Sequence, residues 1–340
     1  MQVDEEWLEE WRQHALRMMQ QLAAIVVGQS AAIRMCTIAV FARGHVLLEG
    51  DVGVGKTTLL RALSRAVGGA YERVEGTIDM MPSDLIYYTY IDDAGKPKVS
   101  EGPLVRHGKS LVTFFFNEIN RARPQVHSLL LRFMAERTVS AFNREYHSPH
   151  MLVFADRNRI EKEETFELPS AARDRFLMDV AVHAPADEGV QKALMFEPRY
   201  HDPDELIRQL PEALIDYLQL NRVARQIQAY VGASDTLRDY ALALCRATAN
   251  PATVGVSLAD VDAADLVEAG ASPRGMSMLL RASRVVAWLD GRDVLIPEDL
   301  HDVFAATIAH RVFFRPVHEL RRAQLAAPLM RQILQRVPAP

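Results

Sequence analysis

The sequence predicts an α/β fold: a parallel sheet covered by helices on both faces, followed by a small all-helical domain. Three observations lead to this prediction. Short apolar runs alternate with helical segments between about residues 45 and 185, strand signals are absent after that point, and one glycine-rich loop joins a strand to a helix. The 340 residues are enough for two domains of ordinary size.

Five apolar runs have the length and composition of strands that are buried on both faces. The helical segment after the third run has apolar residues at i, i+3, i+4, i+7 and i+8 between Val126 and Met134, which indicates an amphipathic helix. Alternation of this kind is typical of a parallel sheet. The expected strands are residues 45–48, 71–74, 111–116, 151–155 and 176–182.

The remaining segments can be placed around this sheet. Residues 1–24 predict an N-terminal amphipathic helix, and residues 25–185 predict the core, with hairpin insertions at about 87–99 and 138–147. Residues 186–340 are expected to form the helical domain and a C-terminal tail, with the boundary near 185–203, where prolines interrupt the periodicity. The clearest helical patterns there cover 204–230, 234–249, 274–289 and 297–309.

Composition excludes several classes of protein. The chain has 39 basic and 44 acidic residues and a net charge of −5, which disfavours a nucleic-acid partner. It has no apolar run of membrane-spanning length, and its acidic N-terminus is unlike a signal peptide, so we expect a cytoplasmic protein without a membrane span. Cys36 and Cys245 are too few for a disulfide framework, and we expect both to be buried thiols.

The glycine-rich loop fits the pattern G-x-x-x-x-G-K-[ST], between the first strand and a helix. Backbone N–H groups in such a loop turn toward an anion, and the helix behind adds its positive end. Lys56 is expected to reach the β- and γ-phosphates of a nucleotide, and the Thr57 hydroxyl to bind magnesium. The expected nucleotide-binding residues here are Gly50, Val52, Gly53, Val54, Gly55, Lys56, Thr57 and Thr58.

The third strand leads into Asn117 and Glu118. A carboxylate at the end of a buried strand is costly unless it has a partner or a function, so Glu118 is predicted to orient and activate an attacking water. The alternative is a carboxylate that only pairs with a nearby arginine. Asn117 is the second expected magnesium-site residue, and its amide oxygen accepts a hydrogen bond from a metal-bound water without contributing charge.

Together with these residues, several further motifs make the chain resemble the MoxR family of AAA+ ATPases over nearly its whole length. The order and spacing of the motifs make the resemblance specific. They are Val26-Val27-Gly28-Gln29, Pro82-Ser83-Asp84, Glu118-Ile119-Asn120-Arg121-Ala122, Asn158, Leu168-Pro169 through Asp174-Arg175-Phe176, and Gly270-Ala271-Ser272-Pro273-Arg274.

The resemblance implies a role for each matching residue. Val27 and Gly28 would lie near the adenine, and Asn158, as sensor 1, would hydrogen-bond the γ-phosphate or the attacking water. Arg175 would be an arginine finger that reaches the ATP of a neighbouring subunit, whereas Arg274, as sensor 2, would reach the ATP of its own. A planar and permanently charged guanidinium suits both tasks.

The resemblance also implies cofactors and partners. ATP and Mg²⁺ would be the cofactors, and the chain would form a ring, expected to be a homohexamer, that remodels, matures or activates a client enzyme. Family members often act with a partner that carries a von Willebrand factor A domain. A DNA motor is disfavoured by the charge balance.

The chain departs from the family pattern at three places. Asn117 replaces an aspartate, Ser170 replaces a glutamate, and Asp156-Arg157-Asn158-Arg159 stands where TQNP is common. Loss of the charge at position 117 predicts that hydrolysis needs more magnesium than is usual. The alternative function is therefore an ATP-binding scaffold that hydrolyses slowly.

Overall fold

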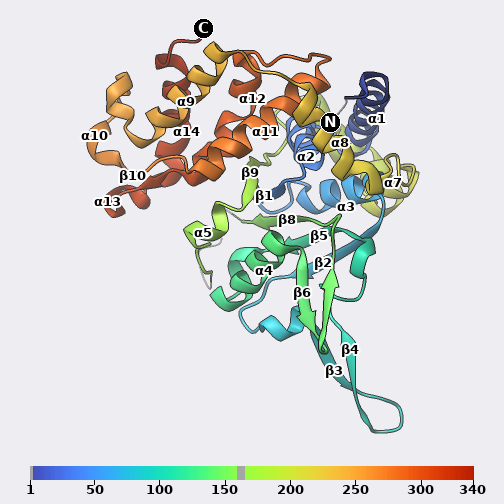
Figure 1. Cartoon of the computed structure of the whole chain (residues 1–340). Coiled ribbons are helices and arrows are strands. Elements are labelled where there is room, and N and C mark those ends of the chain that lie inside the picture. Colours follow the sequence, from blue (N-terminus) through green and yellow to red (C-terminus); the bar gives the residue numbers. More distant parts are fainter. Residues whose placement is uncertain (1–2, 159–164) are drawn as a thin grey trace. The chain divides into compact units, whose positions relative to one another are not determined.

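The computed structural model describes residues 3–158 and 165–340, and the chain divides into two compact units (Figure 1). The core unit comprises His14–Arg175 and Val180–Asn221. The helical unit comprises the described part of Met1–Gln13, together with Phe176–Asp179 and Arg222–Pro340.

Four parallel strands, β2, β5, β8 and β1, are the centre of the core unit, and they belong to a five-stranded sheet with the order β2-β5-β8-β1-β9. Every residue of β5 is buried. All five expected strands are confirmed, with ends shifted by no more than two residues. They are β1 (His45–Glu49), β2 (Ala70–Glu75), β5 (Leu111–Asn117), β8 (Leu152–Arg157) and β9 (Phe176–Ala181).

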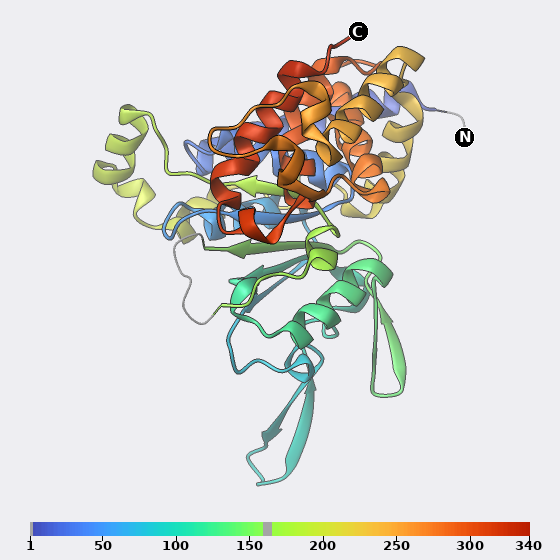
Figure 2. The same cartoon turned by 90° about the vertical axis from the view of Figure 1, so that its left-hand side faces the viewer.

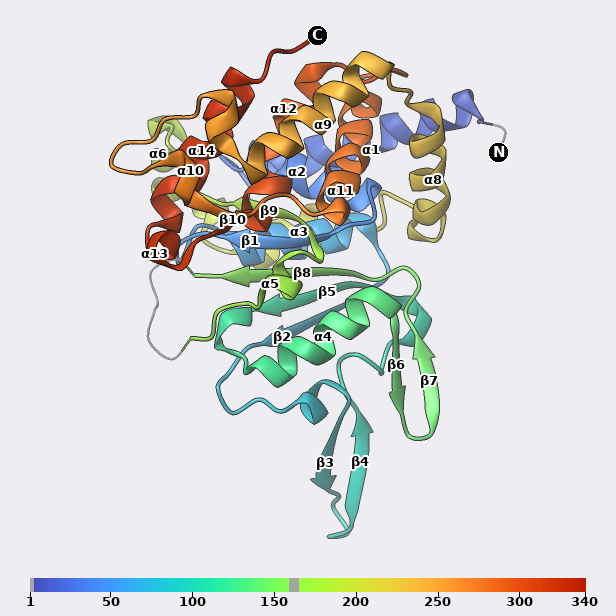
Figure 3. The same cartoon turned by 60° about the vertical axis from the view of Figure 1, so that its left-hand side comes forward.

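Helices cover both faces of this sheet, as expected. Figure 3 shows α4 along one face and α3 on the opposite side, the arrangement that right-handed crossovers between parallel strands produce. Four of the five residues of the predicted stripe on α4 are buried, and Leu129 is half-buried. The ring centroids of Phe133 on α4 and Phe114 on β5 lie 6.4 Å apart. The helices between α1 and α6 are α2 (Ser30–Phe41), α3 (Lys56–Val67), α4 (Pro124–Glu136) and α5 (Ser170–Arg173).

Both predicted hairpins are present and project from the same side of the core unit (Figures 2 and 3). The ring centroids of Tyr87 and Phe142 lie 6.0 Å apart, and the Tyr146 hydroxyl donates to a Glu101 carboxylate oxygen at 3.2 Å. The two insertions therefore contact each other. They are β3 (Tyr87–Ile91) with β4 (Pro97–Glu101), and β6 (Thr138–Ala141) with β7 (Arg144–His147).

Residues 180–221 belong to the core unit, which differs from the expected boundary near 185–203. Two arginines of α3 hold this segment. Arg61 forms an ion pair with Asp204 on α7 (Pro203–Gln209) at 2.5 Å, and Arg65 Nε donates to the Leu210 carbonyl at 2.6 Å. The segment also contains α6 (Glu188–Phe196). Proline spacing does not reveal such contacts, because they join residues about 140 positions apart.

Three of the four helices expected from periodicity lie in the helical unit, together with shorter elements. The fourth expectation, a single helix over 204–230, is wrong, because the chain forms α7 and α8 with residues 210–219 between them. A ladder of β10 and β11 is additional, since strands of three and two residues are too short to show a sequence pattern. The elements are α8 (Leu220–Tyr230), α9 (Asp235–Ala249), α10 (Ala263–Leu266), β10 (Val267–Ala269), α11 (Pro273–Leu289), α12 (Pro297–Ile308), β11 (Phe313–Phe314), α13 (Pro316–Glu319) and α14 (Arg322–Arg336).

The predicted N-terminal helix is α1 (Glu5–Ile25), which begins in the helical unit and continues into the core unit. Its buried face consists of Leu8, Trp11, Ala15, Met18 and Leu22. Among the described residues, no helix is both long and apolar enough to cross a membrane. Burial raises the pKa of the Cys36 thiol to about 12 and that of Cys245 to about 11, so both side chains are unreactive core residues.

The fully buried Arg311 organises the helical unit. Its guanidinium donates to the backbone carbonyls of Phe176, Leu177 and Thr307. Gly275 on α11 gives it space, since a Cβ there would lie 2.6 Å from Arg311 Cδ. A buried carbonyl that loses its donor destabilises the folded state, so these contacts hold the unit together.

We expect Arg311→Met to lower the free energy of unfolding of the helical unit by about 3 kcal/mol, because buried carbonyls lose their donor. Tryptophan fluorescence during urea unfolding is a suitable measurement, since Trp7, Trp11 and Trp288 all lie in this unit. Arg331→Met, an exposed position on α14, is the matched control and should change stability by less than about 0.5 kcal/mol. Equal unfolding midpoints for the two variants would contradict this account of Arg311.

Candidate functional site

The glycine-rich loop joins the end of β1 to the start of α3, as predicted. Gly53 and Gly55 have φ of +79° and +90°, which favour glycine, and a Cβ at either would meet no atom within 4 Å. Gly50 is required for space instead, because a Cβ there would lie 2.2 Å from the Val182 carbonyl oxygen. The backbone conformation therefore depends on all three glycines, and the space beside Gly53 and Gly55 is open.

The other predicted loop residues surround this turn. Val52 is exposed and Val54 half-buried, while Thr57 and Thr58 occupy the first turn of α3 and are half-buried. The Thr57 hydroxyl is thus on the helix that follows the loop, at the end where its N–H groups have no carbonyl partners in the helix. This geometry is suited to binding a phosphate group.

Lys56 joins the loop to the neighbouring strand. Its buried Nζ donates to the Gly50 carbonyl at 2.6 Å and to Asn158 Oδ1 at 2.7 Å. A carboxylate oxygen of Asp156 lies 3.5 Å from the same Nζ. The ammonium is therefore held at the carboxyl ends of β1 and β8, where parallel sheets commonly bind ligands.

Glu118 follows β5 in a left-handed conformation, with φ of +53°. Asn158 Nδ2 donates to Glu118 Oε1 at 3.2 Å, and Arg121 pairs with Oε2 at 3.0 Å. The carboxylate thus has the arginine partner considered as the alternative, but it is also connected through Asn158 to Lys56. The structure brings Lys56, Glu118 and Asn158 together as predicted.

Asn117 is buried at the end of β5, one residue before Glu118. Its backbone carbonyl accepts from Gly76 N at 2.8 Å, and a Cβ on Gly76 would lie 2.3 Å from the Glu118 carbonyl oxygen. The close approach of Gly76 fixes the backbone at the point where β5 ends. Asn117 therefore has a rigid position beside the catalytic candidate Glu118.

The segment around Val27 and Gly28 is also attached to the loop. Gln29 is buried, and its Nε2 donates to the Val54 carbonyl at 3.1 Å and to the His183 carbonyl at 2.7 Å. Gly28 has φ of +77°, and a Cβ there would lie 2.6 Å from a side-chain carbon of Pro185. This segment is therefore attached to the phosphate loop through Gln29, while the position of Val27 and Gly28 near an adenine stays a prediction.

The two predicted arginines lie in different units of the chain. Arg175 is half-buried in the core unit and donates to the Ala171 carbonyl at 3.0 Å, just after α5, which begins at Ser170. Arg274 is exposed at the start of α11 in the helical unit. Their roles remain predictions. Arg159, in the departure from TQNP, lies outside the described residues.

Asp156 is the site residue that sequence reasoning did not identify. It is 2 % exposed, and its Oδ1 accepts from the Glu118 backbone N–H at 2.6 Å. Burial raises the pKa of the Asp156 carboxyl, while the Glu118 N–H and the Lys56 ammonium oppose that shift. An aspartate where the resembled family commonly has threonine was the available signal, but the sequence does not show that it faces Lys56.

These residues fit a metal-bound nucleotide. Thr57, Asn117 and Asp156 offer hydroxyl, amide and carboxylate oxygens, the donors that Mg²⁺ prefers. Among the described residues, no cluster of three or more His, Cys, Asp or Glu side chains is arranged to hold a metal alone. A cation at this edge would therefore need the phosphates of a nucleotide as further ligands, which is the usual arrangement for magnesium.

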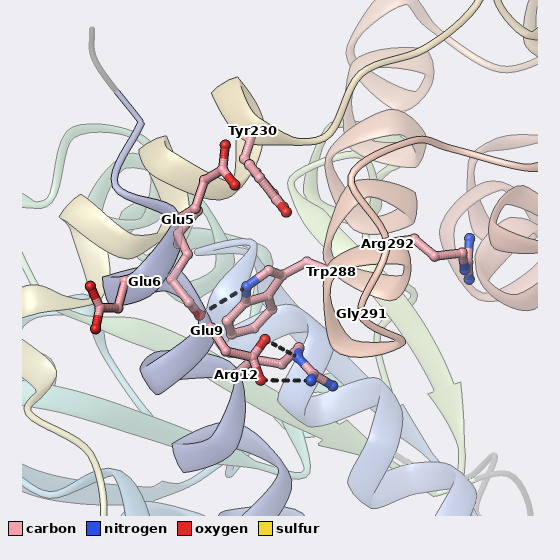
Figure 4. Close-up of a pocket in the computed structure, with 9 residues that line it drawn as sticks. Glu5, Glu6, Glu9, Arg12, Tyr230, Trp288, Gly291 and Arg292 are labelled. Atoms are coloured by element: carbon pink, nitrogen blue, oxygen red, sulfur yellow. Dashed lines mark hydrogen bonds and ion pairs between the residues drawn. The ribbon is translucent and has the colours of Figure 1, made fainter.

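A separate pocket of about 300 Å³ lies within the helical unit (Figure 4). The Trp288 indole N–H donates to the Leu8 carbonyl at 3.3 Å, and Glu9 pairs with Arg12 at 2.7 Å. None of the predicted site residues lines it. Its lining consists of Glu5, Glu6, Leu8, Glu9, Arg12, Tyr230, Trp288, Gly291 and Arg292.

Comparisons with known families identify both parts of the chain. Residues 45–178 match the ATPase family associated with various cellular activities (AAA), and residues 260–329 match the AAA lid domain. A crystal structure of a protein from Cytophaga hutchinsonii, provisionally assigned as an ATPase, superimposes with a TM-score of 0.82 at 27% identity, covering 99% of this chain and 98% of that one. The AAA core with a helical lid is thus the observed fold.

Curated relatives extend over almost the same length. Protein MoxR of Methylorubrum extorquens is 55% identical, covering 98% of this chain and 97% of the relative. Protein MoxR of Paracoccus denitrificans is 53% identical, covering 94% of each. Chaperone MoxR1 of Mycobacterium tuberculosis is 33% identical, covering 86% of this chain and 74% of the relative. With the phosphate loop and the residues around Lys56 in place, this similarity shows that the chain belongs to the MoxR family of AAA+ ATPases.

Proposed function

We propose that this chain binds ATP with Mg²⁺ and hydrolyses it in a ring of identical subunits, expected to be a hexamer, to remodel, mature or activate a client protein. One observation carries the proposal: a continuous hydrogen-bonded path from the Lys56 ammonium through Asn158 to the Glu118 carboxylate. The path connects the group expected on the phosphates to the group expected on the attacking water.

Lys56, Glu118 and Asn158 would each have a separate role in phosphoryl transfer. Lys56 would leave the Gly50 carbonyl and Asn158 for the β- and γ-phosphates. Glu118 would then orient the attacking water and take up its proton, while Asn158 holds the glutamate in place through Nδ2. The magnesium ion, when bound, neutralises charge on the phosphates. Positioning and electrostatics of this kind account for most of the catalysis in phosphoryl transfer.

The two arginines would complete the site from different directions. Arg175 would act on the ATP of the neighbouring subunit, and Arg274 on the ATP of its own subunit as the lid moves. Within the described part of the chain, Arg175 Nη1 donates to the Ala171 carbonyl, a neutral acceptor that a charged phosphate oxygen could replace. Active sites formed in this way exist only in an oligomer, which links hydrolysis to assembly.

The paired hairpins support an interaction with another protein. They expose apolar side chains in a group, which in soluble proteins marks an interaction site. A client protein, or a partner with a von Willebrand factor A domain, is the expected occupant. The exposed residues are Tyr87, Tyr88, Tyr90, Ile91, Val99 and Phe142.

The second candidate is an ATP-binding scaffold that hydrolyses slowly, and the uncharged Asn117 favours it. A magnesium-dependent phosphate-release assay on the purified chain separates the two functions. Steady turnover supports the enzyme, whereas ATP-dependent assembly without phosphate release supports the scaffold.

The first prediction at this site separates binding from chemistry. Lys56→Ala removes a phosphate contact and should weaken binding of a fluorescent ATP analogue by about a hundredfold. Glu118→Gln keeps the size of the side chain and its place beside Asn158, so it should bind the analogue normally while phosphate release falls by at least about a hundredfold. Equal loss of nucleotide affinity in both variants would contradict the assigned roles.

The second prediction places the finger in trans. Arg175→Ala should lower turnover by about 10³- to 10⁵-fold and leave nucleotide binding in its own subunit intact. Mixing Arg175→Ala chains with Glu118→Gln chains should restore activity, because some interfaces then combine an intact glutamate with an intact arginine. Each variant assembled alone is the control. Mixed rings that show no recovery would exclude a finger acting between subunits.

A further inference from the structure

Two departures from the family pattern are neighbours in the sheet. Asn117 ends β5 and Asp156 lies near the end of β8, and these strands are paired in parallel. Phe116 is opposite Ala155, so the next position on each strand places Asn117 beside Asp156. The chain thus lacks a carboxylate on one strand and has an additional one at the same level on the adjacent strand.

The additional carboxylate faces the nucleotide-binding edge. Asp156 Oδ2 lies 3.5 Å from Lys56 Nζ, and Oδ1 accepts the Glu118 N–H at 2.6 Å. Asn158 lies two positions further along the chain, and its Oδ1 accepts a hydrogen bond from Lys56 Nζ at 2.7 Å. Because side chains two positions apart in a strand point to the same face, Asp156 and Asn158 both face Lys56. Asp156 therefore lies directly between the phosphate-binding lysine and the catalytic glutamate.

Charge balance shows what this carboxylate needs. A buried carboxylate is strongly unfavourable without a cation, and Lys56 supplies one in the nucleotide-free chain. When Lys56 turns to the phosphates, it shares its charge with them. Asp156 then requires another cation, and Asn117 beside it has no negative charge to compete for one.

We propose that Asp156 is the carboxylate that serves nucleotide-bound magnesium in this chain, in place of the acidic residue absent at position 117. The inference rests on the proposed binding of ATP with Mg²⁺. It predicts that the negative charge that serves the metal stands on β8, at Asp156, instead of on β5, where the resembled family has an aspartate. The high magnesium requirement expected from Asn117 alone would then not arise.

The test compares binding of a fluorescent, slowly hydrolysed ATP analogue in excess Mg²⁺ and in EDTA. The ratio of the two dissociation constants measures the coupling between metal and nucleotide without any turnover. Asp156→Asn should reduce this ratio by about ten- to a hundredfold, because the dication loses a nearby charge. In EDTA, the affinity of the Asp156→Asn chain for the analogue should equal or exceed that of the unmodified chain, since a negative charge near the phosphates is removed.

A charge-relocation variant makes the test specific. Asp156→Thr combined with Asn117→Asp places the carboxylate back on β5 and should restore the ratio, whereas Asp156→Thr alone should not. Threonine retains an oxygen that can accept the Glu118 N–H, so this pair also serves if Asp156→Asn does not fold. Asp299→Asn removes an equally buried carboxylate, paired with Arg292 in the helical unit, and should leave the ratio unchanged.

The outcomes separate the inference from the proposed function. If Asp156 only positions Lys56, its variants will lose affinity equally with and without metal, and the relocated charge will restore nothing. Either result overturns the inference. If the unmodified chain binds no analogue under any condition, the proposed function itself is wrong.

Discussion

The structure of the site depends on the buried ammonium of Lys56. A charged group with so little exposure requires several oxygen partners, and here they come from different elements: the Gly50 carbonyl after β1, and Asn158 and Asp156 at the end of β8. Those oxygens converge only if the strands keep their parallel register. The apolar sheet, whose central strands are buried on both faces, therefore determines the position of a single charge.

In the proposed function, the same arrangement links phosphate binding to water activation. Asn158 uses its oxygen toward Lys56 and its nitrogen toward Glu118, so a change at the lysine alters the partner of the glutamate. Asp156 also contacts both residues: its carboxylate pairs with Lys56 Nζ and accepts the backbone N–H of Glu118. Nucleotide arrival is thus expected to rearrange the hydrogen bonds of the whole group together.

The sequence predicted the sheet well because strands buried on both faces are continuous apolar runs, and it predicted the phosphate loop because the motif is local. It did not reveal contacts between distant residues. The spacing from Asn117 to Asp156 gives no indication that they are neighbours, and the arginines of α3 that hold residues 180–221 resemble ordinary surface charges. Arg311 was missed for the same reason, since burial of an arginine is decided by tertiary packing.

A crystal structure of the Glu118→Gln chain with ATP and Mg²⁺ tests the central claim most directly. The account predicts that Lys56 Nζ leaves Asn158 and the Gly50 carbonyl for the β- and γ-phosphates. It also predicts that the Asp156 carboxylate accepts a hydrogen bond from a magnesium-bound water. A structure in which Lys56 stays paired with Asp156, while the metal shell contacts Asn117 alone, would contradict it.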